Sequence, residues 1–60
     1  MPINLLILHE IAYKASLVTS KRKYKEFERW LVDTLQRYND AAVARVANIH
    51  LFRLRDQFSF

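Results

Sequence analysis

The clearest structural signal in this chain lies in residues 21–38, which read KRKYKEFERWLVDTLQRY. Apolar and aromatic residues recur there every three or four positions, and at ~100° per residue this spacing places them on one side of a helix. The residues of this stripe are Tyr24, Phe27, Leu31, Leu35 and Tyr38. The opposite side carries charges of alternating sign that can pair along a helix surface, namely Arg22, Glu26, Arg29, Asp33 and Arg37. We therefore predict an amphipathic helix over about 21–38 that buries its stripe in a core.

Short polar pairs flank this helix and predict where it and its neighbours end. Thr19 and Ser20 carry hydroxyls that can cap a helix N-terminus. Asn39 tolerates the left-handed backbone that often follows a helix, and Asp40 can cap the next one. Apolar patterns on either side predict helices over about 3–17 and 41–57. We expect an all-α protein, a small bundle of three short helices, in one domain that covers residues 1–60.

Two other layouts remain open from the sequence. If Asn39 and Asp40 stay helical, the chain is a helical hairpin with one long second helix. Apolar residues also alternate along 11–17 and 47–51, as they do in strands. The chain contains no glycine, and without a turn dipeptide before Ile11 a β-hairpin there is hard to build.

Composition excludes several classes of protein. The chain has 60 residues, a net charge of +4, no cysteine and no glycine. It therefore has no disulfides, no thiolate metal site and no glycine-rich phosphate loop. The apolar run before His9 is far shorter than the ~20 residues that span a bilayer, so no transmembrane segment is expected. No basic segment precedes that run, so we expect no secretory signal and a cytoplasmic location.

The residues that could carry chemistry are few. His9 and Glu10 begin like the zinc-protease pattern HExxH, but Tyr13 stands where that pattern needs its second histidine. His50 is the other histidine, and no set of nucleophile, base and orienting residue is evident. We predict that the protein is not an enzyme and uses no cofactor or metal.

The two outer helices carry more apolar residues than one small core can bury. Helix 3–17 has two apolar faces. The broad face consists of Leu5, Leu8, Ile11, Ala12 and Ala15, with Ile7 and Val18 beside it. The second face consists of Leu6, Tyr13 and Leu17. One face of helix 41–57, continued by the residue that follows the helix, consists of Val43, Ala47, Leu51, Leu54 and Phe58. Across the helix from much of this face lie two further apolar residues, Ile49 and Phe52. Trp30 lies at the edge of the 21–38 stripe, where it is either a boundary residue or an anchor for a partner.

Contiguous exposed apolar surface usually marks an interface. We therefore expect oligomerisation, with a dimer as the first candidate, or a larger protein partner to complete the bundle. The residues predicted to contact that partner are Leu6, Tyr13, Leu17, Trp30, Ile49 and Phe52. The alternative is that helix 3–17 simply lies at the centre of the molecule, with the remaining apolar residues scattered on its surface.

A basic cluster opens helix 21–38. Its members are Lys21, Arg22, Lys23 and Lys25. Cations at a helix N-terminus oppose the helix dipole, and the N–H groups that end there attract anions. The cluster is therefore a candidate contact for phosphates or for an acidic protein surface. The alternative is a solvated turn that Glu26 and Glu28 partly neutralise.

These observations favour a small interaction protein that acts by protein–protein binding. It would be an accessory subunit, or an inhibitor or regulator of a larger machine, of the kind that phages encode. The main alternative is a small dimeric nucleic-acid-binding protein that places its basic cluster on phosphates, and steep salt dependence would identify it. Peripheral membrane binding through helix 21–38 is a weaker third hypothesis, because acids interrupt its cations.

Overall fold

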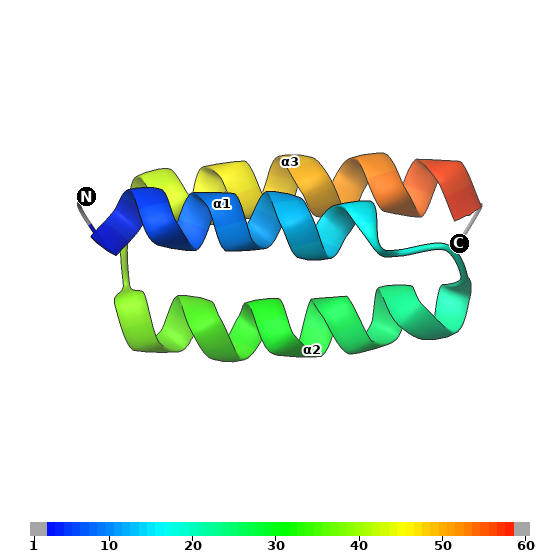
Figure 1. The fold of residues 1–60 in the computed structure, drawn as a ribbon, viewed down its shortest axis with the longest axis horizontal. Coiled ribbons are helices and arrows are strands. Elements are labelled where there is room, and N and C mark those ends of the chain that lie inside the picture. The colour runs from blue at the N-terminus through cyan, green and yellow to red at the C-terminus, as the bar shows by residue number, and fades with distance from the viewer. Residues whose placement is uncertain (1–2, 59–60) are drawn as a thin grey trace.

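The computed structural model describes residues 3–58, which form three helices joined by two short loops. The helices are α1 (Ile3–Ser16), α2 (Lys21–Tyr38) and α3 (Ala41–Phe58). Helices α1 and α3 run in the same direction, and α2 runs back between the two loops (Figure 1). The part of the chain that the structure describes contains no strand, so the all-α prediction is confirmed and the strand alternative is wrong.

Ser20 caps the start of α2 as the sequence predicts. Its backbone is extended, and its Oγ accepts a hydrogen bond from the Lys23 N–H at 3.3 Å. Its carbonyl oxygen accepts another from the Tyr24 N–H at 2.9 Å. Two backbone donors of the first turn thus have partners from one residue, which fixes the beginning of the helix.

The two residues between α2 and α3 break the chain into separate helices. Asn39 has the left-handed backbone, with φ 39° and ψ 52°, and its N–H donates to the Leu35 carbonyl at 3.0 Å. Asparagine is among the few residues other than glycine that adopt this conformation routinely. The Asp40 Oδ1 then accepts from the N–H groups of Ala42 at 2.9 Å and Val43 at 3.1 Å. The alternative of one long second helix is therefore wrong.

Each helix contributes one large, fully buried side chain to the centre of the core. These are Ile11, Leu31 and Val43. Around them the core takes a single stripe from each helix, completed by Ile7, Ala15, Val18, Tyr24, Phe27, Ala47 and Leu54. The predicted stripe of α2 is confirmed at its centre, whereas Leu35 is partly buried and Tyr38 is exposed at the end. The predicted core face of α3 is also confirmed, with Leu51 and Phe58 partly buried against it.

The predicted broad face of α1 is rotated relative to the one that the structure buries. The buried residues are Ile7, Ile11 and Ala15, followed by Val18 in the loop, and Leu8 packs against them. Leu5 and Ala12, which we predicted to share that face, are exposed. Helix α1 is apolar on most sides, so its hydrophobic pattern alone did not select between two overlapping stripes.

Replacing Leu31 with alanine empties the middle of this core. We expect the free energy of unfolding to fall by ~2–5 kcal/mol, the usual effect of truncating a buried leucine. A domain of this size holds only about 5 kcal/mol in total, so cooperative thermal unfolding in circular dichroism should be lost. The matched control is Val32→Ala, at the next position but exposed, which should change stability by less than ~0.5 kcal/mol. Equal losses in both variants would contradict the assignment of the stripe.

Replacing Asp40 with alanine removes the acceptor for two backbone N–H groups of α3. We expect a loss of ~0.5–2 kcal/mol in urea denaturation, as for other N-cap residues. The Asp40→Asn variant keeps a side-chain oxygen in place and should retain most of that stability. If alanine and asparagine behave alike, the cap contributes nothing measurable.

Candidate interaction surface

One face of α1 carries large apolar side chains that lie outside the core. Leu6 is 52% exposed, Tyr13 is 66% exposed and Leu17, just past the helix, is 50% exposed. Their spacings of seven and four residues align them along one side of the helix, and we call them the α1 stripe. The prediction that this second apolar face lies outside the core is confirmed.

The α1 stripe ends in a cleft between α1 and α2. The cleft has a volume of about 300 Å³ and is lined by Lys14, Leu17, Val18, Lys23, Glu26, Phe27 and Trp30. It lies between the two helices that pack least extensively against each other. Two residues of the predicted interface, Leu17 and Trp30, therefore share one site.

The Trp30 ring has two neighbours, one from its own helix and one from α1. Its ring stacks near that of Phe27, with centroids 6.1 Å apart and an interplanar angle of 26°. The Lys14 Nζ lies 5.1 Å from the centroid of the Trp30 ring and so connects α1 to α2 across the cleft. A cation–π contact of this kind is worth ~0.5–1 kcal/mol where it is exposed. Trp30 is partly buried, so it combines an anchored ring with a surface that a partner can reach.

Ile49 and Phe52 are exposed on a different helix. Their exposed fractions are 54% and 69%, but they are not among the residues that line the α1–α2 cleft. Helix α1 meets α3 on another side, where Ala12 and Ser16 form a groove with α3 residues. Four of the six predicted interface residues therefore belong to the α1 stripe and its cleft, and the other two lie on α3 outside that cleft.

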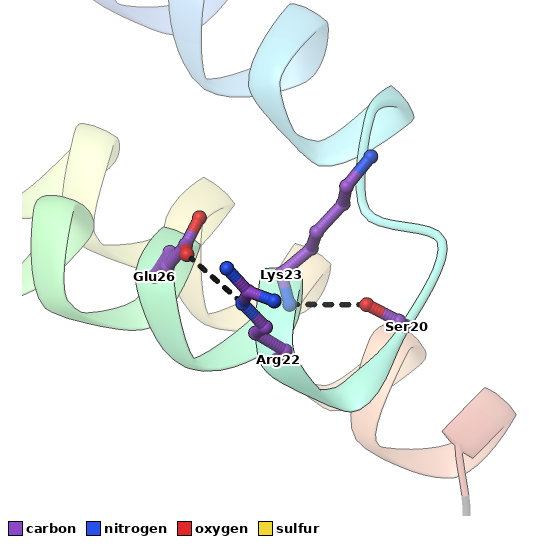
Figure 2. A network of polar contacts seen from close by, with 4 residues as sticks. All are labelled: Ser20, Arg22, Lys23 and Glu26. Atoms are coloured by element: carbon purple, nitrogen blue, oxygen red, sulfur yellow. Dashed lines mark hydrogen bonds and ion pairs between the residues drawn. The ribbon is translucent and has the colours of Figure 1, made fainter.

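The basic cluster at the start of α2 is divided between two directions. Figure 2 shows the Arg22 side chain extending along α2 to Glu26, where the Arg22 Nε and Glu26 Oε1 are 3.9 Å apart. The Lys23 side chain extends instead toward the end of α1 and lines the cleft. Lys21 and Lys25 are exposed. At ~100° per residue, Lys21, Arg22 and Lys25 fall on one side of the helix and Lys23 lies apart from them.

The fold also changes the electrostatic surroundings of this cluster. The cluster lies at the N-terminus of α2, where its positive charges interact unfavourably with the dipole of that helix. The C-terminal ends of α1 and α3 lie at the same end of the bundle (Figure 1), and cations stabilise helix C-termini. The cluster therefore lies at the end of the bundle where the dipoles of α1 and α3 favour positive charge, which the sequence of α2 alone does not reveal.

A second groove lies between α1 and α3. Its volume is about 280 Å³, and its lining includes Ala12, Ser16, His50, Arg53 and Gln57. Burial lowers the pKa of His50, and the positive charge of Arg53 lowers it further. Within residues 3–58, no three His, Cys, Asp or Glu side chains come together in a way that could hold a metal ion.

No protein family, curated protein or solved structure matches this chain. None of the helices described here is both long enough and apolar enough to cross a membrane.

Among the cleft residues, Val18 and Phe27 were predicted only as apolar packing residues, and Lys14 and Glu26 were not predicted as site residues at all. Each of the latter two lies beside a predicted interface residue of its own helix, since Lys14 precedes Leu17 by three positions and Glu26 precedes Trp30 by four. Their place in the cleft follows from how α1 and α2 pack, which no single-helix pattern contains.

The lowered pKa of His50 predicts how stability depends on pH. The unfolded chain, with a histidine pKa of about 6.5, binds the proton more tightly than the folded chain does, so stability falls as the pH decreases through about 6.5. Urea denaturation between about pH 5 and pH 8 should show this fall, and His50→Gln should flatten it. His9→Gln, at an exposed position of α1, serves as the control. If the His50→Gln profile keeps the slope of the wild type, His50 is not the group responsible.

Proposed function

We propose that this protein acts by binding another protein, as a non-enzymatic accessory subunit or as an inhibitor or regulator of a larger machine. The observation that carries the proposal is that the α1 stripe, Leu6, Tyr13 and Leu17, leads into the cleft that holds Trp30. Burying such surface is favourable by ~25 cal/mol per Å² of apolar area. Contact with a partner would remove this apolar surface from water and so contribute a favourable free energy to binding.

The types of residue on this surface support the same proposal. Tyrosine and tryptophan are enriched among the residues that dominate binding energies at interfaces, and Tyr13 and Trp30 both lie in this region. Trp30 is already ordered by Phe27 and by Lys14. An ordered anchor loses little conformational entropy on binding, which increases affinity.

The same surface supports self-association as one form of the proposal. Two copies that met through their α1 stripes would bury Leu6, Tyr13 and Leu17 on both sides. Each copy carries a net charge of +4, so this association should strengthen as salt screens the repulsion. Nucleic-acid binding has less support, because Arg22 pairs with Glu26 and Lys23 is turned toward α1, away from the other cations (Figure 2). Such binding would weaken with salt.

The test replaces the α1 stripe with polar residues of similar helix propensity, in the triple variant Leu6→Gln, Tyr13→Gln and Leu17→Gln. We expect unchanged helical content, a thermal midpoint close to that of the wild type, and about a tenfold loss of the partner recovered from a lysate of the source cells. Sedimentation at micromolar concentration shows in parallel whether any assembly larger than the 7.2 kDa chain disappears in the variant.

The control is the double variant Ile49→Gln and Phe52→Gln, which changes exposed apolar residues on α3. It should retain both the partner and the sedimentation behaviour of the wild type. A loss of partner only in this control would move the binding surface to α3. Full binding by both variants would overturn the proposal that an exposed apolar face carries the function.

A further inference from the structure

The α1–α2 cleft combines an apolar floor with two positive charges from different helices. Leu17, Val18, Phe27 and Trp30 supply the apolar side chains, Lys14 comes from α1 and Lys23 from α2. Glu26 is the one acidic residue in the lining. The volume of about 300 Å³ is at the lower end of the range for pockets that enclose small ligands. It therefore suits one large apolar side chain with polar groups beside it.

The charges at this cleft select for a negative partner. The Lys14 ammonium lies over the Trp30 ring, and among residues 3–58 it forms no ion pair. A carboxylate is a stronger partner for an ammonium than a ring face is, because a hydrogen bond between two charged groups is stronger than one between neutral groups. Lys23, turned toward α1 (Figure 2), brings a second ammonium from the α2 side.

Resting on the proposed function, we propose that the α1–α2 cleft binds an acidic segment of the partner protein. A large apolar side chain of that segment occupies the cleft against Trp30, and its neighbouring carboxylates pair with Lys14 and Lys23. A second copy of this chain suits the cleft less well, because each copy carries a net charge of +4. A bare phosphate or nucleic acid backbone would use the two lysines but leave the apolar floor uncovered.

The experiment selects peptides from a random library displayed on phage, with the whole protein immobilised. We expect enriched sequences to place Asp and Glu around Leu, Phe or Trp, as an apolar anchor with acidic flanks requires. The selection is then repeated on the double variant Lys14→Gln and Lys23→Gln. Acidic enrichment should disappear there, and the best wild-type peptide should lose about tenfold in affinity.

The control removes two positive charges elsewhere, in the double variant Arg29→Gln and Arg45→Gln. Both positions are exposed and neither lines the cleft. Because this variant has the same net charge as the Lys14 and Lys23 variant, it separates the cleft lysines from general attraction to a basic protein. It should select the same acidic peptides as the wild type, with an affinity within about twofold.

Trp30 gives a direct readout of where the peptide binds, because it is the single tryptophan of the chain. A selected peptide without tryptophan should shift the emission of Trp30 in the wild-type protein. The peptide concentration that gives half of this shift should agree with the affinity measured independently. Binding with no change in Trp30 emission would overturn the proposed location.

Three further outcomes would overturn the inference. They are a selection with no acidic enrichment, acidic enrichment that survives in the Lys14 and Lys23 variant, and enrichment lost equally in the Arg29 and Arg45 control. If the α1 stripe variant loses its partner while the Lys14 and Lys23 variant keeps it, the proposed function stands and only the acidic segment is wrong.

Discussion

The burial of Ile11, Leu31 and Val43, one side chain from each helix, fixes how each helix is rotated about its own axis. In a chain of 60 residues the core has room for a single stripe per helix, because small domains bury a smaller share of their surface than large ones do. Once Ile11 of α1 faces inward, Leu6 and Tyr13 must face outward, since they lie on the other side of the same helix. The exposed surface is thus a direct consequence of the packing at the centre.

Sequence patterns were informative where a helix has one polar and one apolar side. In α2 the charged face left a single orientation possible, and Ser20, Asn39 and Asp40 mark its ends by chemistry specific to helix termini. In α1 the pattern failed, because Leu5 and Ile7 are both compatible with a buried stripe and the choice depends on packing against α3. The α1–α2 cleft was not predictable for the same reason, as its residues come from two helices whose spacing is a tertiary property.

The basic cluster shows why neighbours in sequence need not act together. Arg22 and Lys23 are adjacent, yet one is turned toward Glu26 and the other toward α1 (Figure 2). These two positive charges, although adjacent in the sequence, therefore have different surroundings. Lys23 gains its importance from Lys14 and Trp30, which lie elsewhere in the chain, and the cluster as a whole gains its setting from the ends of α1 and α3.

The parallel arrangement of α1 and α3 also bears on the order of folding. The most extensive contacts of α1 are with the helix furthest from it along the chain, and its contacts with adjacent α2 are the least extensive. A chain that ends before residue 41 lacks the main packing partner of α1, and isolated helices of this length are marginal in water. Closing the α1–α3 contact brings together segments separated by the whole of α2, at the entropic cost of a long loop. Stable packing of α1 during synthesis is therefore expected only after residues 41–58 have been made.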